Sequence, residues 1–290
     1  MMIQKILIFF FAPLLFLSCQ QVNQPENHQQ DPPQGSLFII GGGHRSLELM
    51  DRLSAEAGIY EGGDVVILPM SSSVPDSAII WSSESFLELG IELERIKGYN
   101  FEPEQEPKEE WINVMRKAKL IYISGGDQNR FMDIVRDTPI FDAIHHAYQQ
   151  GAMIAGTSAG AAVMSEKMIT GDELRYEEYR STFRTIESEN IEIADGLGLL
   201  TTAIIDQHFV WRSRHNRLIS AVIEYPHLPG IGIDESTAIL VRGDSAEVVG
   251  ISQVLVYRNP DRSALTQEHK LGAKNLRLDI YLPGETFSIK

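Results

Sequence analysis

The chain has 290 residues, and 25 Lys and Arg residues against 40 Asp and Glu residues give a formal charge of −15. This excess of acid argues against nucleic-acid binding, which needs a basic face to displace counterions. A hydrophobic content of 43% with 22% charged residues excludes wholesale disorder. The single cysteine excludes a disulfide framework, a cysteine-rich zinc site and an iron–sulfur cluster.

Residues 1–19 have the pattern of an export signal. Lys5 precedes an apolar run, Ile6 to Leu17, which is shorter than the roughly 20 residues that span a bilayer. Cys19 follows this run and resembles the lipidated Cys of a bacterial lipobox, although Phe16 stands where Leu is more usual. We therefore expect an exported lipoprotein, anchored to a membrane through Cys19 on the extracytoplasmic side, in the periplasm or at the cell surface. Plain signal-peptide cleavage is the alternative.

Residues 20–35 form the next segment, with six Gln and three Pro. Such a composition buries too little apolar area to become ordered, so we interpret it as a flexible spacer. Residues 36–290 contain no second linker and no internal repeat, and we expect them to form a single domain.

Apolar runs rich in β-branched residues alternate with helical periods in the first part of this domain. Strands are expected at 37–40, 65–68, 120–123 and 152–155, and helices at 46–57, up to Phe86 and at 141–150. The pattern predicts an α/β three-layer sandwich with a mostly parallel sheet, whose ligand crevice lies beyond the carboxyl ends of the strands. Residues 238–241, 246–249 and 253–257 are expected to form short hairpin strands.

Gly156-Thr157-Ser158-Ala159-Gly160 follows one of these strands and precedes an apolar helix expected at 161–164. Glycines flank the serine because the strand-to-helix turn is tight. Such a turn presents the Ser158 hydroxyl at a helix N-terminus, where backbone N–H groups favour negative charge. The N–H of Ala159 is then a natural oxyanion donor, and the alternative is a plain tight turn.

A nucleophilic serine needs a base, and His208 is the histidine that closes an apolar run, Leu199 to Ile205. We place it at the same sheet edge as Ser158. The short strand 231–233 ends in Asp234 and Glu235, and either carboxylate could orient the histidine.

Five motifs occur in order between Leu37 and Arg242. They are Ser124–Gln128, Gly156–Ala161, Asp206–Phe209, the arginines 212, 214 and 217, and Gly230–Glu235. Together they resemble the motifs of the cyanophycinases and their relatives, serine peptidases of family S51 that include the aspartyl dipeptidases. The resemblance implies a flavodoxin-like fold, similar to that of class I glutamine amidotransferases.

The resemblance also implies roles for individual residues. Ser158 would be the nucleophile, His208 the general base and Glu235 the acid that orients it. The N–H groups of Gly126 and Ala159 would form the oxyanion hole. Substrate contacts would come from six residues: Gln128, Asp206, Gln207, Arg212, Arg214 and Arg217.

The three arginines suit an aspartate-rich substrate, because guanidinium groups bind carboxylates bidentately. We place Arg214 and Arg217 on one face of a helix that opens at Arg212 and runs to Ile223. A solvated helix face is the other interpretation. In the cyanophycinases similar arginines recognise β-linked aspartyl-arginine units, so the pattern favours hydrolysis of arginyl-polyaspartate over the aspartyl dipeptidase branch.

Two other functions are open alternatives. An α/β-hydrolase esterase also uses G-x-S-x-G, but its histidine follows the acid, which would make His269 the base. A lipid-tethered binding protein without catalysis is the second. No cofactor is expected, and no metal, because no His, Asp and Glu grouping has ligand-like spacing. The charged segment 171–190 is a candidate lid, and family relatives are often dimers, which makes a homodimer an expectation by analogy.

Overall fold

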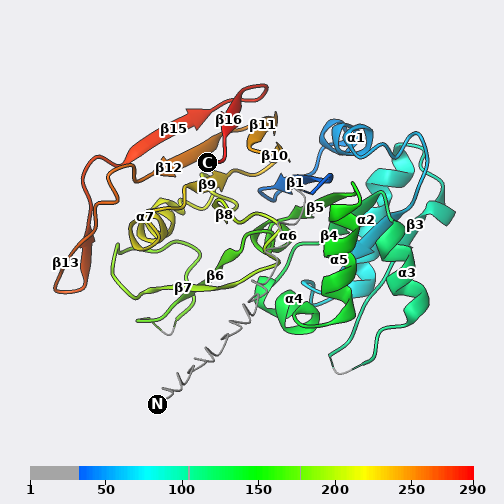
Figure 1. Cartoon of the computed structure of the whole chain (residues 1–290), viewed down its shortest axis with the longest axis horizontal. Coiled ribbons are helices and arrows are strands. Elements are labelled where there is room, and N and C mark those ends of the chain that lie inside the picture. The colour runs from blue at the N-terminus through cyan, green and yellow to red at the C-terminus, as the bar shows by residue number, and fades with distance from the viewer. Residues whose placement is uncertain (1–32, 104, 177) are drawn as a thin grey trace, which may run out of the picture. The chain divides into compact units, whose positions relative to one another are not determined.

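A computed structural model of the chain describes residues 33–103, 105–176 and 178–290. The expected signal segment, Cys19 and most of the spacer lie outside these residues. Within them, no helix is both long enough and apolar enough to cross a membrane. Two sheets with their covering helices account for most of the described chain (Figure 1).

The central sheet has eight strands. In spatial order they are β16 (Thr286–Ser288), β11 (Ser245–Gly250), β10 (Thr237–Arg242), β1 (Ser36–Ile40), β5 (Met153–Thr157), β4 (Leu120–Ile123), β2 (Val65–Leu68) and β3 (Ile96–Gly98). The last five pair in parallel, whereas the first three pair antiparallel with their neighbours and with β1. The predicted strands at 37–40, 65–68, 120–123 and 152–155 are confirmed, and so is the α/β class with a mostly parallel sheet.

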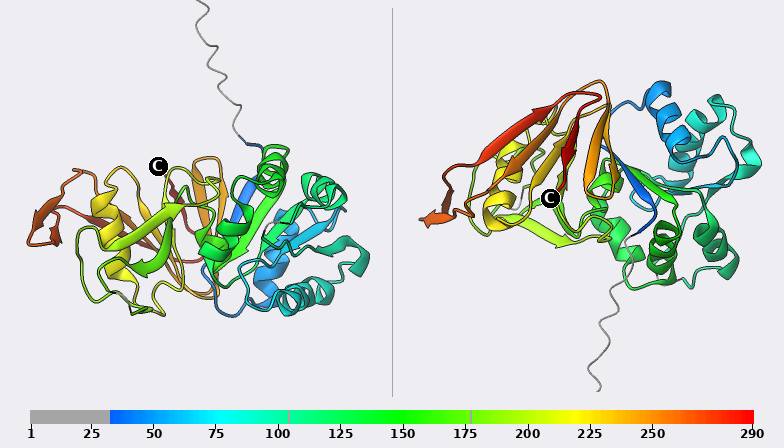
Figure 2. Two further views of the ribbon diagram at one scale, coloured as in Figure 1. Left: turned by 90° about the horizontal axis from the view of Figure 1, so that it is seen from below. Right: turned by 45° about the horizontal axis from the view of Figure 1, so that its top comes forward.

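Helices cover both faces of this sheet (Figure 2). They are α1 (Leu47–Glu56), α2 (Pro75–Glu88), α3 (Glu109–Lys117), α4 (Gln128–Val135), α5 (Pro139–Gln149) and α6 (Ala159–Ala162), with a 3₁₀ turn at Leu93–Arg95. The apolar sides of α1 and α2 pack on one face, against Phe38, Ile40 and their neighbours. Helices α3 to α6 pack on the other face, against Leu37, Ile39 and their neighbours. Alternate residues of each strand thus supply two separate cores.

A second sheet lies beside the first and was not expected. Its order is β15 (Arg277–Tyr281), β12 (Val254–Arg258), β9 (Gly230–Ile233) and β8 (Ile204–Asp206), and α7 (His215–Glu224) packs on it. β10 and β11 form the predicted hairpin, but β12 pairs with β9 and β15 instead. Gly250 has a φ of 120°, and this turn directs the chain from the first sheet into the second.

Two hairpins complete the fold: β6 (Lys167–Glu173) with β7 (Ile191–Asp195), and β13 (Leu265–Gln267) with β14 (Lys270–Gly272). Two predicted helix boundaries are wrong. The helix after Ser158 is a single turn that begins at Ala159 and ends at Ala162. The helix expected from Arg212 begins at His215, because Ser213 has a φ of 48° and interrupts the helical backbone.

Candidate active site

Ser158 stands at the sharp turn between β5 and α6. Its φ of 54° and ψ of −112° are strained for a residue with a side chain. The turn is held by close packing: a Cβ at Gly156 would collide with the backbone of Gly160, and a Cβ at Gly160 with the carbonyl of Ile123. The N–H of Ser158 donates to the Ile40 carbonyl at 3.0 Å. The two glycines of the motif are therefore required by space, as the sequence analysis expected.

His208 contacts Ser158 although their strands belong to different sheets. The Nε2 of His208 lies 2.8 Å from the Ser158 Oγ, and Nδ1 lies 2.5 Å from Oε1 of Glu235. The imidazole is in line between hydroxyl and carboxylate, so it could accept the serine proton while the carboxylate stabilises the resulting charge. Asp234, the other carboxylate of the pair, accepts instead from the backbone N–H of Trp211 and from Ser252 Oγ.

The glycine turn after β1 fits against this histidine. Gly42 has a φ of 105°, and a Cβ there would collide with the His208 ring. A Cβ at Gly43 would lie 2.7 Å from the Cβ of Glu235. The N–H of His208 donates to the Gly41 carbonyl at 2.6 Å. Gly42 and Gly43 are therefore needed because side chains of distant residues pack directly against them. This role was not predicted from the sequence, because those residues are distant in the chain.

His208 is 7% exposed, and burial is the largest influence on its pKa, which lies below the ordinary value of 6.5. The hydrogen bond to Glu235 acts in the opposite direction, while the positive charges of Arg212 and Arg214 lower the pKa further. The imidazole is thus neutral, and able to accept a proton, throughout the neutral pH range.

The loop after β4 passes beside Ser158 and brings Gly126 to the site. A Cβ on Gly125 would lie 3.8 Å from the Ser158 Oγ. In the described part of the chain, neither the N–H of Gly126 nor that of Ala159 has a hydrogen-bond acceptor. Both are free to donate to a developing oxyanion. The one-turn length of α6 leaves little helix dipole to assist them.

A polar cavity of about 260 Å³ opens on one side of Ser158, and we name it the arginine pocket. Its walls include Gln128, Asp172, Tyr179, Arg212, Arg214 and Arg217. The segment 171–190, expected as a lid, thus contributes Asp172 and Tyr179. Burial and the charges of Glu192 and Asp127 raise the pKa of Asp172.

Arg214 and Arg217 were predicted on one face of a helix that opens at Arg212, but the helix begins only at His215, so Arg214 is not a residue of that helix. Arg214 precedes the first turn of α7, whereas Arg217 lies within the helix and is 1% exposed. Arg217 forms a bidentate ion pair with Asp206, whose carboxylate is fully buried. Arg212 makes no ion pair within the described residues. The solvated-face interpretation is therefore wrong for Arg217.

The remaining predicted contact residues support this pocket through hydrogen bonds. Arg214 donates to the backbone and side-chain oxygens of Gln207, at 2.9 and 2.7 Å. Burial and the neighbouring Arg217 lower the pKa of Arg214 to about 10, so it stays charged at neutral pH. Gln128 donates to the carbonyls of Ile169 and Thr170 on β6. Asp206 does not border the cavity and acts behind it.

A second cavity of about 260 Å³ opens on the other side of Ser158, and we name it the Trp81 pocket. Its walls include Gly43, Arg45, Trp81, Ser82, Thr157 and His208. This pocket was not predicted from the sequence. The available signal was a polar run, His44-Arg45-Ser46, directly after the glycine turn that follows a strand, together with a tryptophan on a predicted helix.

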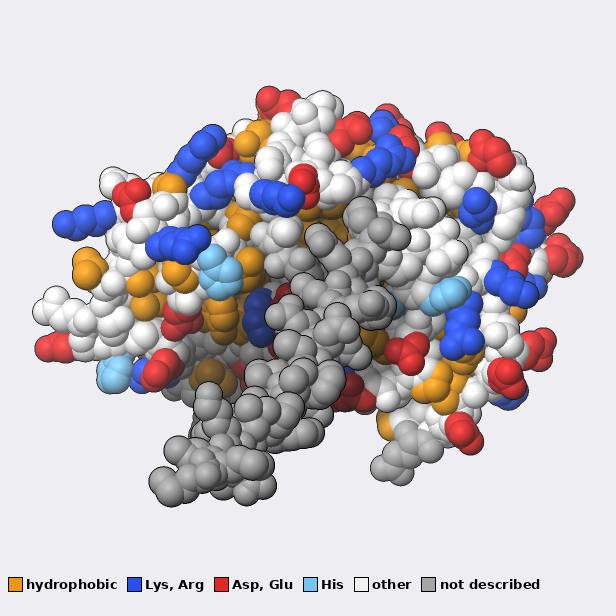
Figure 3. All heavy atoms as spheres, viewed as in Figure 1, with side chains coloured by type: hydrophobic (Ala, Val, Ile, Leu, Met, Phe, Trp, Pro, Cys, Tyr) orange, Lys and Arg blue, Asp and Glu red, His pale blue; other side chains and the backbone are white. Residues whose placement is uncertain are grey.

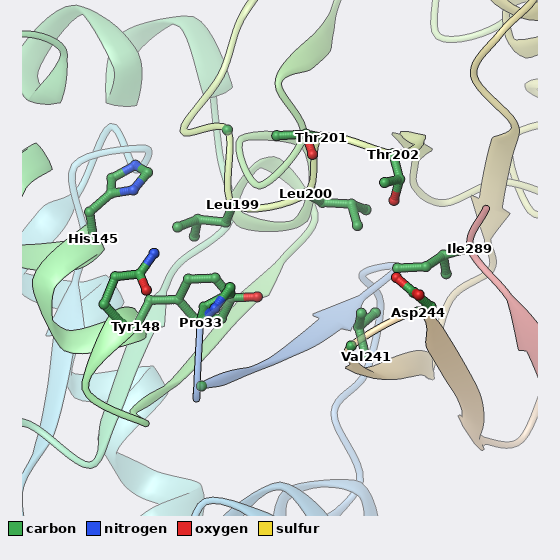
Figure 4. Close-up of a pocket in the computed structure, with 14 residues that line it drawn as sticks. Pro33, His145, Tyr148, Leu199, Leu200, Thr201, Thr202, Val241, Asp244 and Ile289 are labelled. Atoms are coloured by element: carbon green, nitrogen blue, oxygen red, sulfur yellow. The ribbon is translucent and has the colours of Figure 1, made fainter. Parts of the chain in front are cut away.

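A third cavity, of about 300 Å³, lies at the opposite, amino end of the central strands (Figure 4). Residues of α5, of the 199–202 loop and of the chain end converge on it. Its histidine, His145, bonds through Nε2 to the Leu197 carbonyl at 2.7 Å and, among the residues that the structure describes, has no hydroxyl partner of the kind that His208 has. We assign no chemistry to this cavity.

His269, the base in the esterase alternative, lies in the exposed turn between β13 and β14. Its Nδ1 lies 3.1 Å from a guanidinium nitrogen of Arg175, and its backbone carbonyl accepts from Ser188. Metal ligands are not gathered anywhere in residues 33–103, 105–176 and 178–290: no three His, Cys, Asp or Glu side chains are suitably grouped. Acidic and basic side chains are interspersed on the face shown in Figure 3.

Comparison with known proteins supplies the context for this geometry. The family model described as peptidase family S51 matches residues 37–249. The cyanophycinase of Trichormus variabilis is 33% identical over 282 residues, covering 92% of this chain and 90% of that protein. The cyanophycinase of Synechococcus elongatus is 31% identical over 277 residues, covering 91% and 82%. A crystal structure of a peptidase from an acI-B1 actinobacterium covers 88% of this chain and 97% of its own, with a TM-score of 0.63 at 22% identity, and shows a shared fold.

Proposed function

Because the chain belongs to peptidase family S51 and is a hydrolase, we propose that it is a serine peptidase that cleaves aspartyl amide bonds by a Ser158–His208–Glu235 triad. The observation that carries this proposal is the unbroken line of hydrogen bonds from Ser158 Oγ through His208 to Glu235 beside a pocket lined by arginines. An acceptor placed 2.8 Å from a hydroxyl, with its own orienting carboxylate, is the arrangement that activates a serine.

The chemistry is acyl transfer in two halves. His208 Nε2 accepts the Ser158 proton as Oγ bonds to the amide carbon, and the carbonyl oxygen becomes an anion held by the N–H groups of Gly126 and Ala159. The carbon–nitrogen bond then breaks, the electron pair stays on nitrogen, and His208 gives its proton to the leaving amine. Water deprotonated by the same histidine attacks the acyl-enzyme, which releases the acid and restores Ser158.

For the substrate we propose arginyl-polyaspartate, with release of β-aspartyl-arginine units. Two observations support this choice: the proteins that resemble the chain over most of its length are cyanophycinases, and the arginine pocket carries a guanidinium, on Arg212, that is not paired with any described carboxylate. The acid Asp172 on the same wall suits the cationic side chain of such a unit. An aspartyl dipeptidase activity remains the alternative within the family.

The test is incubation of the protein from residue 20 onward with insoluble arginyl-polyaspartate, with α- and β-aspartyl dipeptides and with p-nitrophenyl esters. Released amines are identified by mass spectrometry, and Ser158→Ala is the control. Release of β-aspartyl-arginine by the wild type alone supports the proposal. Cleavage of dipeptides alone moves the substrate to the dipeptidase branch. Ester turnover alone supports the esterase alternative, and binding of the polymer without any turnover supports the binding-protein alternative.

We further propose that the chain is exported and lipid-anchored through Cys19, in keeping with the lipobox-like pattern of residues 1–19. Expression of the full chain with Cys19 or with Cys19→Ala tests this. Recovery of the wild type, but not the variant, in the membrane fraction, with a lipid-sized mass on its N-terminal peptide, is the expected result. A homodimer stays a prediction, which sedimentation velocity would test.

A further inference from the structure

The Trp81 pocket has an unassigned role, and its position beside the base limits what that role can be. His208 lines this pocket and does not line the arginine pocket, whereas Ser158 lines both. In acyl transfer the protonated histidine must reach the nitrogen that leaves. If the triad acts as proposed, the leaving amine therefore lies on the Trp81 side of Ser158, and the acyl part lies in the arginine pocket.

One positive charge of the Trp81 pocket is not used by the described part of the fold. Arg45 is half-buried and pairs with no carboxylate in the described residues.

Trp81 adds an apolar surface to the same cavity. It stands on α2, lines the pocket and is 55% exposed. An exposed indole beside a cation matches a ligand with a carbon chain and a negative charge.

We propose that the Trp81 pocket is the leaving-group subsite and that it selects an amine whose main-chain carboxylate is free and pairs with Arg45. Trp81 packs against the carbon chain of the same amine. For the reaction, this inference rests on the proposed function. The binding of the amine product to the Trp81 pocket does not depend on that function. The inference implies that the scissile bond lies next to the carboxyl-terminal unit of the substrate.

The experiment compares two synthetic arginyl-aspartate oligomers, identical except that the main-chain carboxylate of the carboxyl-terminal unit is free in one and amidated in the other. The measured quantity is the ratio of their kcat/KM values. We expect the wild type to favour the free-carboxylate oligomer by about 10- to 100-fold, the range for a charge-assisted hydrogen bond. Arg45→Met brings the ratio close to one, and Arg45→Lys gives an intermediate value. Arg116→Met, an exposed arginine of α3 outside the pocket, keeps the wild-type ratio.

A binding measurement separates failure of this inference from failure of the proposed function. In the Ser158→Ala protein, calorimetric titration with β-aspartyl-arginine gives the affinity for the leaving unit without turnover. We expect Arg45→Met in that background to weaken binding tenfold or more. A preference that survives in folded Arg45→Met, or a wild type that does not discriminate, overturns the inference. If neither oligomer is cleaved, the proposed function fails and the titration alone tests the subsite. An affinity for β-aspartyl-arginine that is lost with Arg45 then supports the subsite. An unchanged affinity overturns the subsite.

Discussion

The two pockets that meet at Ser158 differ in how their positive charges are held. In the arginine pocket, Arg217 is tied to Asp206 and Arg214 to Gln207, and all four side chains are buried. In the Trp81 pocket, Arg45 is half-buried without a described carboxylate partner. The arginines 214 and 217 of the arginine pocket are thus part of the core, whereas Arg45 of the Trp81 pocket is open to a ligand. Substitutions on the first side should couple activity to stability, whereas substitutions on the second should change recognition alone.

Ser158 lines both pockets, and removal of its hydroxyl should have the largest effect on activity. Ser158→Ala should lower kcat by about 10⁵-fold or more, because no other described group can form the acyl-enzyme. Both pockets should still bind their ligands. The measurement is steady-state hydrolysis of the polymer with product binding as a control. Residual turnover within 100-fold of the wild type would contradict a serine mechanism.

Glu235→Gln tests the group that orients the base, with the next largest effect. The amide can donate to Nδ1 and so favour the wrong histidine tautomer, and we expect kcat to fall by about 10³- to 10⁴-fold. Asp234→Asn is the matched control, since Asp234 bonds to Trp211 and Ser252 rather than to His208. Equal losses in the two variants would mean that Glu235 acts only through local folding.

Arg217→Met and Arg45→Met together test the contrast directly. Loss of Arg217 leaves the buried Asp206 carboxylate with only the more distant Arg214, at 3.9 Å, as a counter-charge, which should lower the free energy of unfolding by about 3–5 kcal/mol. Arg45→Met should change it by less than about 1 kcal/mol, since no ion pair is broken. Urea denaturation followed by circular dichroism measures both. Similar losses would show that the two pockets are equally structural.

The pH dependence of kcat/KM distinguishes the pockets by their effect on His208. Its pKa is lowered by burial and by Arg212 and Arg214, so the neutral base persists, and activity should be retained, to a pH below 6.5 before the acid limb falls. Arg212→Met removes one of these charges and should move the acid limb to higher pH. Arg45→Met should not, because Arg45 is not among the groups that shift this pKa. An acid limb above 6.5 in the wild type would contradict the assigned environment.

His269→Ala is the smallest expected change. The histidine lies at the exposed turn of the β13–β14 hairpin, and activity should stay within about twofold of the wild type. Loss of turnover there, with Glu235→Gln harmless, would favour the esterase alternative.

The first sheet could be predicted because its signals are local. The strand at 120–123 and the Gly156–Gly160 turn each have a local sequence pattern, so the position of Ser158 in a strand-to-helix turn could be predicted. His208 was found by its place after an apolar run, although its strand is the three-residue β8 in another sheet. That sheet was missed because β9, β12 and β15 pair across long stretches of chain, which periodicity does not record. The pocket lined by Arg45 and Trp81 was not predicted, because its residues come from segments that are distant in the chain.

The fit of the first glycine loop against His208 has a consequence for the order in which the site is assembled. Gly42 leaves the ribosome more than 160 residues before His208, and Ser158 leaves it 50 residues before. A nascent chain folded only as far as β5 therefore displays a serine with no base to activate it. If the triad acts as proposed, a chain truncated before His208 would fold its first sheet and still lack the base that activates Ser158.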